Sequence, residues 1–244
     1  MIEVEGLVAF VGKRRVLDGV DFTVPEGESF GLIGANGSGK TTLIRVLTTL
    51  HPPSAGDARL QGFSVAHEHE KAKLLVGYVP DRFGAYPRMT AQEYLAFYAG
   101  LYGLPRSPDQ GVELLELMGL TAVADTYVEH LSRGLQQRLG MARALVHDPP
   151  ILLVDDNGAI DPRGQADVHR LVRDLCAMGK TVVFATHDLS AVEAMCTQVG
   201  VLHRGRMAAS GPLDTVRAAA GPGGSLTAAF LHLTEDAEDS EGGE

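Results

Sequence analysis

One stretch of the chain has the residue types and spacing of a loop that binds phosphate. It consists of Gly34, Ala35, Asn36, Gly37, Ser38, Gly39, Lys40, Thr41 and Thr42, which match the pattern G-x-x-x-x-G-K-[ST]. Glycines let the backbone curl so that successive N–H groups point inward at phosphate oxygens, and a helix starting at Lys40 adds its positive dipole end. Lys40 reaches the β- and γ-phosphates, and the Thr41 hydroxyl can ligate Mg²⁺. The stretch therefore predicts a site for nucleotide phosphates and Mg²⁺.

A pair of carboxylates follows an apolar run later in the chain. Residues 151–154 are Ile-Leu-Leu-Val, which is typical of a strand buried on both faces of a parallel sheet, and Asp155 and Asp156 come next. Ligands sit at the carboxyl ends of strands in open α/β sheets, so Asp155 is placed to hold Mg²⁺ through water. Asp156 is a candidate to polarise the attacking water. The phosphate loop alone is compatible with kinases, GTPases, helicases and transport ATPases. The carboxylates at the end of this strand favour those classes that hydrolyse a nucleotide with Mg²⁺.

A third segment resembles a known family. Leu131-Ser132-Arg133-Gly134-Leu135 is similar to the signature Leu-Ser-Gly-Gly-Gln of ATP-binding cassette (ABC) ATPases. Arg133 replaces the first Gly of that pattern, and Leu135 replaces its Gln. Ser132 and Gly134 remain, and they supply a hydroxyl and an unhindered N–H at a helix N-terminus. The resemblance implies that these two groups contact the phosphates of ATP.

Further segments follow in the order that the family has. Residues 186–188 (Thr-His-Asp) match the segment that carries the switch histidine, so the resemblance implies that His187 contacts the γ-phosphate. Residues 160–162 (Ile-Asp-Pro) resemble the D-loop, which pairs across a dimer. Residues 77–81 (Gly-Tyr-Val-Pro-Asp) resemble the Q-loop, where the core meets a helical subdomain and the membrane partner. The resemblance runs from residue 2 to about residue 234.

Four departures from the family pattern fall in the site itself. Asp156 replaces the catalytic Glu, and one methylene less draws the carboxylate back by about 1–1.5 Å, which can cost on the order of 10²-fold in rate. The segment 155–162 is one residue shorter than its counterpart and lacks its first Pro. Asp81 replaces the Gln that contacts Mg²⁺ and the attacking water, so it is a candidate catalytic group and metal ligand. Phe10 lies one place off the register of the adenine-stacking aromatic before Gly12, and it can stack on adenine only if the loop is bulged.

Composition and charge set outer limits on function. No stretch of the 244 residues reaches the ~18 uninterrupted apolar residues of a membrane span, and the start of the chain lacks a secretory signal pattern. The last ten residues hold six carboxylates, and the rest carries 25 acidic against 21 basic residues. A mildly acidic body disfavours binding to nucleic acid. We therefore expect a cytoplasmic chain with no nucleic-acid partner.

Hydrophobic patterns predict short strands alternating with helices. Strands are expected at 15–24, 28–33, 58–61, 75–79, 151–155, 181–186, 198–202 and 206–210. Helices are expected at 40–49, 91–102, 107–118, 132–147, 163–178, 189–196 and 213–219. Thr90 to Glu93 form a capping box at the entry to the second of these helices.

These patterns predict an α/β protein. With the resemblance, they indicate an ABC ATPase domain over residues 1–234, with a P-loop NTPase core of mostly parallel sheet at 1–83 and 149–234. The N-terminal part is expected to be an antiparallel β subdomain, and residues 84–148 an inserted α-helical subdomain. The segment 235–244 reads as a disordered acidic tail.

The resemblance implies the ATP-binding subunit of an ABC transporter, of the type that serves multidrug export. Two subunits would close head-to-tail around two ATP–Mg²⁺, as a homodimer or a heterodimer, and a separate integral-membrane permease would hold them at the inner face of the cell membrane. ATP binding is expected to survive the departures, because the phosphate loop is intact, whereas hydrolysis is expected to be slow. The alternatives are a non-catalytic, ATP-gated dimerising regulatory subunit and a soluble ABC ATPase without a transport role.

Overall fold

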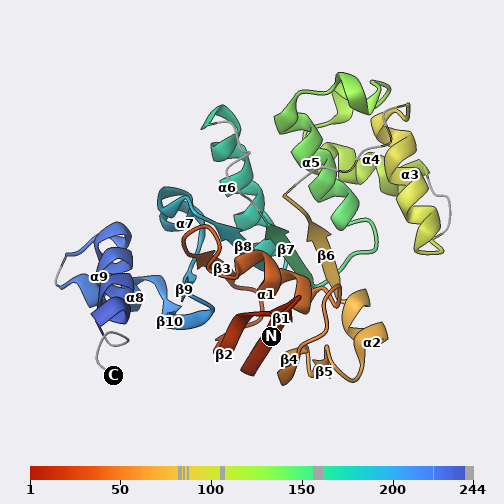
Figure 1. The fold of residues 1–244 in the computed structure, drawn as a ribbon. Helices are drawn as coiled ribbons and strands as arrows, with labels where there is room; N and C mark the ends of the chain where they lie inside the picture. Colours follow the sequence, from red (N-terminus) through yellow and green to blue (C-terminus); the bar gives the residue numbers. More distant parts are fainter. Residues whose placement is uncertain are drawn as a thin grey trace.

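Two β-sheets, one of four strands and one of six, form the centre of the structure (Figure 1). The computed structural model describes residues 1–81, 84, 86, 88–104, 108–155, 162–221 and 223–239. Within these ranges every helix is too short or too polar to cross a lipid bilayer.

The six-stranded sheet has the strand order β10-β9-β3-β8-β7-β6. In that order its strands are Arg206–Pro212, Gln198–His203, Ser29–Ile33, Thr181–Thr186, Ile151–Asp155 and Val76–Val79. All neighbouring strands pair in parallel except β10, which is antiparallel to β9. Crossovers between parallel strands place helices on the faces of a sheet, and β3, β7 and β8 are accordingly buried along their whole length. The expectation of an α/β core with a mostly parallel sheet is confirmed.

Helices cover this sheet on both faces. They are α1 (Lys40–Leu47), α6 (Pro162–Ala177) and α7 (Leu189–Met195). In β7, Ile151 and Leu153 belong to the apolar cluster that contains α1, whereas Leu152 and Val154 belong to the cluster of α6 and α7. Side chains alternate across a strand, so one apolar run fills both clusters.

The four-stranded sheet is antiparallel where its pairings are given, and its order is β2-β1-β4-β5. Its strands in that order are Arg14–Val24, Ile2–Val11, Ala55–Leu60 and Phe63–Ser64, and helix α2 (His69–Leu74) follows them. The strand β1 is an addition to the predicted set, which begins at residue 15. Its apolar alternation is interrupted around Gly6, where φ is 56° and the register with β2 shifts. The prediction of an antiparallel N-terminal piece is confirmed.

The helices between β6 and β7 lie together to one side of the sheets (Figure 1). They are α3 (Ala91–Leu101), α4 (Pro108–Leu117), the 3₁₀ turns η1 (Thr121–Val123) and η2 (Val128–His130), and α5 (Arg133–Ala144). The capping box at the start of α3 is confirmed. Glu93 N donates to Thr90 Oγ1 at 3.3 Å, and Thr90 N donates to Glu93 Oε2 at 2.9 Å.

Two contacts join these helices to the large sheet. A Cβ atom added at Gly77 in β6 would overlap the carbonyl oxygen of Ala144. The end of α5 therefore approaches the strand so closely that only glycine fits at position 77. The ring of His147, just after α5, stacks on Tyr102 at the end of α3, with centroids 4.0 Å apart and planes 13° apart. Backbone contact and ring stacking thus fix the ends of α5 and α3 next to the core.

The C-terminal part of the chain is helical further than the sequence predicts. Its helices are α8 (Leu213–Arg217), η3 (Ala218–Ala220) and α9 (Leu226–Asp239). Residues 235–239, expected to be disordered, therefore belong to α9, and residues 240–244 lie outside the described part. Leu226 and Ala229 are fully buried, and Leu226 N donates to Glu193 Oε1 at 3.0 Å. Packing of this first turn fixes the helix, which then continues into the acidic residues.

The half-buried ring of His147 should make stability depend on pH. Burial lowers the pKa of His147 below its ordinary value of 6.5, so the unfolded chain binds more protons as the pH falls through 6.5 and the free energy of unfolding decreases. The variant His147→Phe keeps a ring to stack on Tyr102 and removes the titration. Urea unfolding should show its free energy of unfolding rising relative to wild type from pH 7 to pH 5. The difference should be constant from pH 7 to pH 8, and parallel curves down to pH 5 would contradict the assignment.

Candidate functional site

The phosphate loop lies between the end of β3 and the start of α1, as the sequence predicts. Gly37 has φ 81° and Gly39 has φ 114°, values that favour glycine because it has no Cβ atom. A Cβ atom added at Gly34 would overlap the carbonyl oxygen of Leu202, so this position also requires glycine. The loop therefore curls tightly over the N-terminus of α1, where backbone N–H groups are free to bind an anion.

Two polar side chains of the loop are almost completely buried. Lys40 is 5% exposed, and its Nζ donates to the carbonyl oxygens of Gly34 at 2.6 Å and Ala35 at 3.1 Å. Burial lowers the pKa of Lys40, and the nearby Asp155 carboxylate acts in the opposite direction. Ser38 Oγ is buried without a hydrogen-bond partner among the described residues. Both side chains hold polar atoms that a phosphate oxygen would satisfy.

Oxygen atoms of α1 and β7 meet beside the loop, and the charge of Asp81 acts on them. Thr41 Oγ1 donates to Asp155 Oδ1 at 3.3 Å, which joins the start of α1 to the end of β7. Burial raises the pKa of Asp155, the hydrogen bond from Thr41 lowers it, and the charge of Asp81 raises it. Asp81 follows β6 and is exposed. Hydroxyl and carboxylate oxygens are the ligands that Mg²⁺ prefers, so this donor set fits the predicted metal site.

Strand register brings the switch segment to the same edge of the sheet. In the parallel pairs, Ile33 lies opposite Thr186 and Asp155 lies opposite Ala185. The exposed His187 therefore follows β8 at the level where β3 enters the phosphate loop. The next residue, Asp188, caps α7 by accepting from Ser190 N at 3.0 Å and Ala191 N at 3.2 Å. This cap fixes the backbone directly after the histidine.

The signature residues lie elsewhere in the chain. Ser132 is the N-cap of α5, and its Oγ accepts from Leu135 N at 3.4 Å. A Cβ atom added at Gly134 would meet nothing within 4 Å, so the space beside Gly134 in the first turn of α5 is open. Figure 1 shows α5 among the helices at the upper right, apart from α1. A single chain thus does not bring the signature to its own phosphate loop.

Phe10 lies near the end of β1, where the strand is irregular. The register with β2 shifts between Ala9 and Phe10, and the stacking of Phe10 on adenine stays a prediction. Phe10 is 41% exposed and lies opposite Arg15. The next residue along β2 is Val16, whose carbonyl oxygen would be 3.1 Å from a Cβ atom at Gly39. The exposed ring therefore lies in the hairpin whose end approaches the phosphate loop.

Two predicted groups lie outside the part of the chain that the structure describes. They are the candidate base Asp156 and the D-loop residues Ile160 and Asp161. Their assignments stay predictions.

Two residues near Asp155, Arg45 and Tyr78, and a third, Arg143, which contacts Tyr78, have no assigned role in the predicted site. Arg45 in α1 lowers the pKa of Asp155 by its charge, and it also hydrogen-bonds the half-buried Tyr78. Arg45 is four residues after Thr41, so helical spacing could have placed both on one face. Arg143 donates to the carbonyl oxygen of Tyr78 at 3.2 Å, across 65 residues of sequence, which no local pattern signals.

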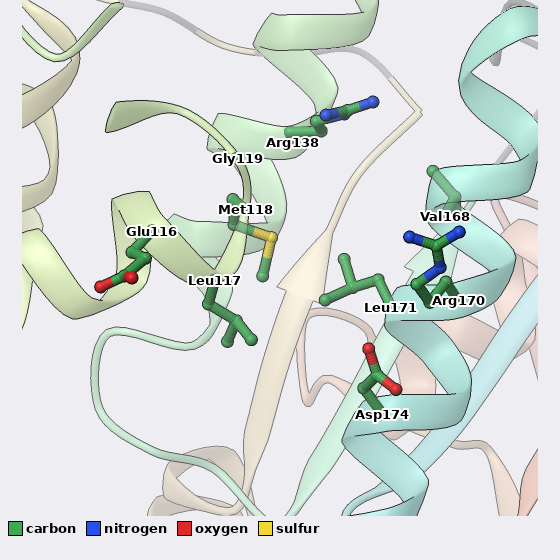
Figure 2. A pocket seen from close by; sticks show the side chains of 9 residues that line it. All are labelled: Glu116, Leu117, Met118, Gly119, Arg138, Val168, Arg170, Leu171 and Asp174. Atoms are coloured by element: carbon green, nitrogen blue, oxygen red, sulfur yellow. The ribbon is translucent and has the colours of Figure 1, made fainter. Parts of the chain in front are cut away.

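A separate cavity of about 240 Å³ lies between helices α4 and α5 on one side and α6 on the other (Figure 2). It is lined by Glu116, Leu117, Met118, Gly119, Arg138, Val168, Arg170, Leu171 and Asp174. None of the predicted phosphate, metal or signature residues lines it. In Figure 2 the apolar side chains of Met118 and Leu171 point toward one another across the gap. The cavity separates α4 and α5 from α6 and lies outside the phosphate site.

A family profile and the sequence relatives of this chain indicate the same protein family. The profile of the family described as ABC transporter matches residues 17–159. The chain is 35% identical over 214 residues to the linearmycin resistance ATP-binding protein LnrL of Bacillus subtilis, covering 86% of this chain and 69% of that protein. It is 36% identical over 214 residues to the Nod factor export ATP-binding protein I of Ralstonia nicotianae, covering 86% and 67%. The chain spans about two thirds of the length of these relatives.

Solved structures agree with the sequence relatives. A structure described as the ATP binding subunit of an ABC transporter superposes with a TM-score of 0.84 at 29% identity, covering 96% of this chain and 99% of that chain. A dimeric ATP-binding cassette bound to ADP and Pi superposes with a TM-score of 0.77 at 25% identity, covering 87% and 98%. The fold and the site define a nucleotide-binding P-loop protein. The chain belongs to the ABC transporter family, and its fold is that of the family's ATP-binding cassette.

Replacing Lys40 should weaken ATP binding strongly. Lys40→Ala removes the buried ammonium that the loop carbonyls orient, and charge-assisted hydrogen bonds of this kind are worth about 1.5–3 kcal/mol. Isothermal titration should therefore show an affinity for ATP about 10- to 100-fold weaker.

The matched control is Lys71→Ala in α2, whose ammonium is exposed and pairs with Glu68. It should bind ATP as the wild type does. Equal affinities for both variants would contradict the assignment of the loop.

Proposed function

We propose that the chain is the ATP-binding subunit of an ABC exporter, which binds ATP–Mg²⁺ at a dimer interface and drives a separate integral-membrane permease. The observation that carries the proposal is the hydrogen bond of Thr41 to Asp155 beside the buried Lys40, because it joins phosphate and metal ligands at one sheet edge. The names of the relatives support the assignment to export and to a subunit that serves a transporter. The permease would hold the subunit at the inner face of the cell membrane.

In this proposal each residue has a defined task. Lys40 and the loop N–H groups bind the β- and γ-phosphates, and Phe10 stacks on adenine. Thr41, Asp155 and Asp81 would hold Mg²⁺, which neutralises phosphate charge when bound. Asp156 orients the attacking water, and His187 contacts the γ-phosphate.

The second half of the site would come from another subunit. Ser132 and Gly134 lie at the start of α5, which is apart from α1 and its phosphate loop (Figure 1), and they supply a hydroxyl and a backbone N–H at a helix N-terminus. The dimeric cassette among the structural relatives supports a dimer here. ATP binding would then favour the closed dimer, because the γ-phosphate lies between the two subunits, and hydrolysis would reopen it.

A carboxylate at position 134 should prevent this dimer. Gly134→Asp keeps α5, since an acidic residue is favourable in the first helical turn, but it places negative charge where the phosphate of the other subunit would bind. Sedimentation velocity with a non-hydrolysable ATP analogue and Mg²⁺ should show dimers for wild type and monomers for Gly134→Asp.

The control is Gly111→Asp, at a helical glycine in α4 that also has open space around it. Gly111→Asp should dimerise like the wild type, and both variants should bind the ATP analogue. Dimers of Gly134→Asp, or monomers of the wild type, would contradict the proposed interface.

Asp156 should make hydrolysis slow. The shorter side chain withdraws the carboxylate, so Asp156→Glu should raise ATP turnover by up to about 10²-fold. Turnover is measured with Mg²⁺ and with Lys40→Ala as the inactive control. Wild-type turnover of several per second would overturn the slow-site proposal, whereas no gain in Asp156→Glu would favour the non-catalytic regulatory subunit.

A further inference from the structure

Two side chains hold the backbone at Tyr78 and at Gly84, on either side of Asp81. Arg143 Nη2 donates to the carbonyl oxygen of Tyr78 at 3.2 Å, and the hydroxyl of Tyr94 donates to the carbonyl oxygen of Gly84 at 3.1 Å. These carbonyls lie three residues before and three residues after Asp81. Arg143 Nη1 donates to the hydroxyl oxygen of Tyr94 at 3.2 Å, so the two holding side chains are themselves joined.

The hydroxyl of Tyr94 is a protonated donor on a buried ring. Its side chain is fully buried in α3, and burial raises the pKa of Tyr94 to about 12, although the charge of Arg143 acts against this. The hydroxyl is therefore protonated at neutral pH. It can donate its proton to Gly84 while it accepts from Arg143.

Arg143 joins two elements that are distant in sequence. It lies in the last turn of α5 and contacts β6 through Tyr78 and α3 through Tyr94. Its guanidinium carbon lies 5.3 Å from the ring centroid of Tyr98, which adds a cation–π contact. The planar guanidinium presents two separate N–H groups at fixed spacing, and a lysine ammonium has no such geometry.

Asp81 itself is exposed, so its position depends on the backbone on either side of it. Val79 lies opposite Val154 in the parallel pair of β6 and β7, so Asp81 follows β6 at the sheet edge where β7 ends in Asp155, and its charge raises the pKa of Asp155. We propose that Tyr94 and Arg143 are positioning residues, which hold the Asp81 carboxylate beside Thr41 and Asp155 for Mg²⁺ binding. This inference rests on the proposed function and assigns the residues that align its metal site.

The test measures how strongly Mg²⁺ and ATP binding are coupled, without using turnover. The dissociation constant for ATP is determined in EDTA and in excess Mg²⁺, and the first is divided by the second. Tyr94→Phe keeps the buried ring and removes only the hydroxyl. It should reduce this ratio about 3- to 10-fold, as expected when the hydrogen bond that holds Gly84 is lost, and leave the affinity in EDTA unchanged.

A double-mutant cycle asks whether the effect passes through Asp81. Asp81→Ala should reduce the ratio, and adding Tyr94→Phe to it should reduce the ratio no further. Arg143→Lys should behave as Tyr94→Phe does, because one ammonium cannot replace the forked contact. The matched control is Tyr127→Phe, which removes the hydroxyl of an exposed tyrosine and should leave the ratio at the wild-type value.

The outcomes separate the inference from the function on which it rests. A wild-type ratio in Tyr94→Phe, additive effects in the double variant, or an equal loss of affinity in EDTA would each overturn the positioning role. Wild-type protein that binds no ATP, or binds it equally with and without Mg²⁺, would overturn the proposed function, and this inference with it.

Discussion

The whole site depends on the parallel register of three strands. β3, β7 and β8 are far apart in sequence, yet Ile33, Asp155 and Thr186 reach one edge of the sheet because each strand is pinned by burial on both faces. A slip of one residue would move Asp155 by about 3.3 Å and turn it to the other face. Its hydrogen bond to Thr41 would then be lost. The apolar filling of both clusters is therefore what sets the spacing of the phosphate and metal ligands.

Burial of charged groups also favours the binding of phosphate and a metal ion at the site. Burial shifts the pKa of Lys40 downward and that of Asp155 upward, so both charged forms are disfavoured, and each charge only partly relieves the other. An anion beside Lys40 and a cation beside Asp155 would relieve both groups at once. Because the carbonyls of Gly34 and Ala35 already orient Lys40, little reorganisation is needed when phosphate arrives.

Sequence patterns predict those elements and site residues whose structure depends on neighbouring residues in the chain. The bounds of β7 and β8 match the prediction, since a continuous apolar run between polar residues has one way to be buried in a parallel sheet. The strand β1 is missing from the prediction because the bulge at Gly6 breaks its alternation, and α9 because its helical start depends on the distant Glu193. The phosphate loop and Asp155 follow from motifs.

The Tyr94–Arg143 pair leaves no such trace in the sequence, because its contacts cross 49 and 65 residues. It nevertheless gives α5 a second task. Ser132 caps the start of this helix and Arg143 lies in its last turn, about 16 Å away at 1.5 Å per residue. In the proposed dimer, the nucleotide of the other subunit would displace Ser132. Because α5 moves as a rigid helix, the displacement would be transmitted to Arg143. The movement of Arg143 would then shift the backbone at Tyr78 and Gly84. Helix α5 would thereby couple the γ-phosphate bound by one subunit to the proposed metal ligand Asp81 of the other subunit.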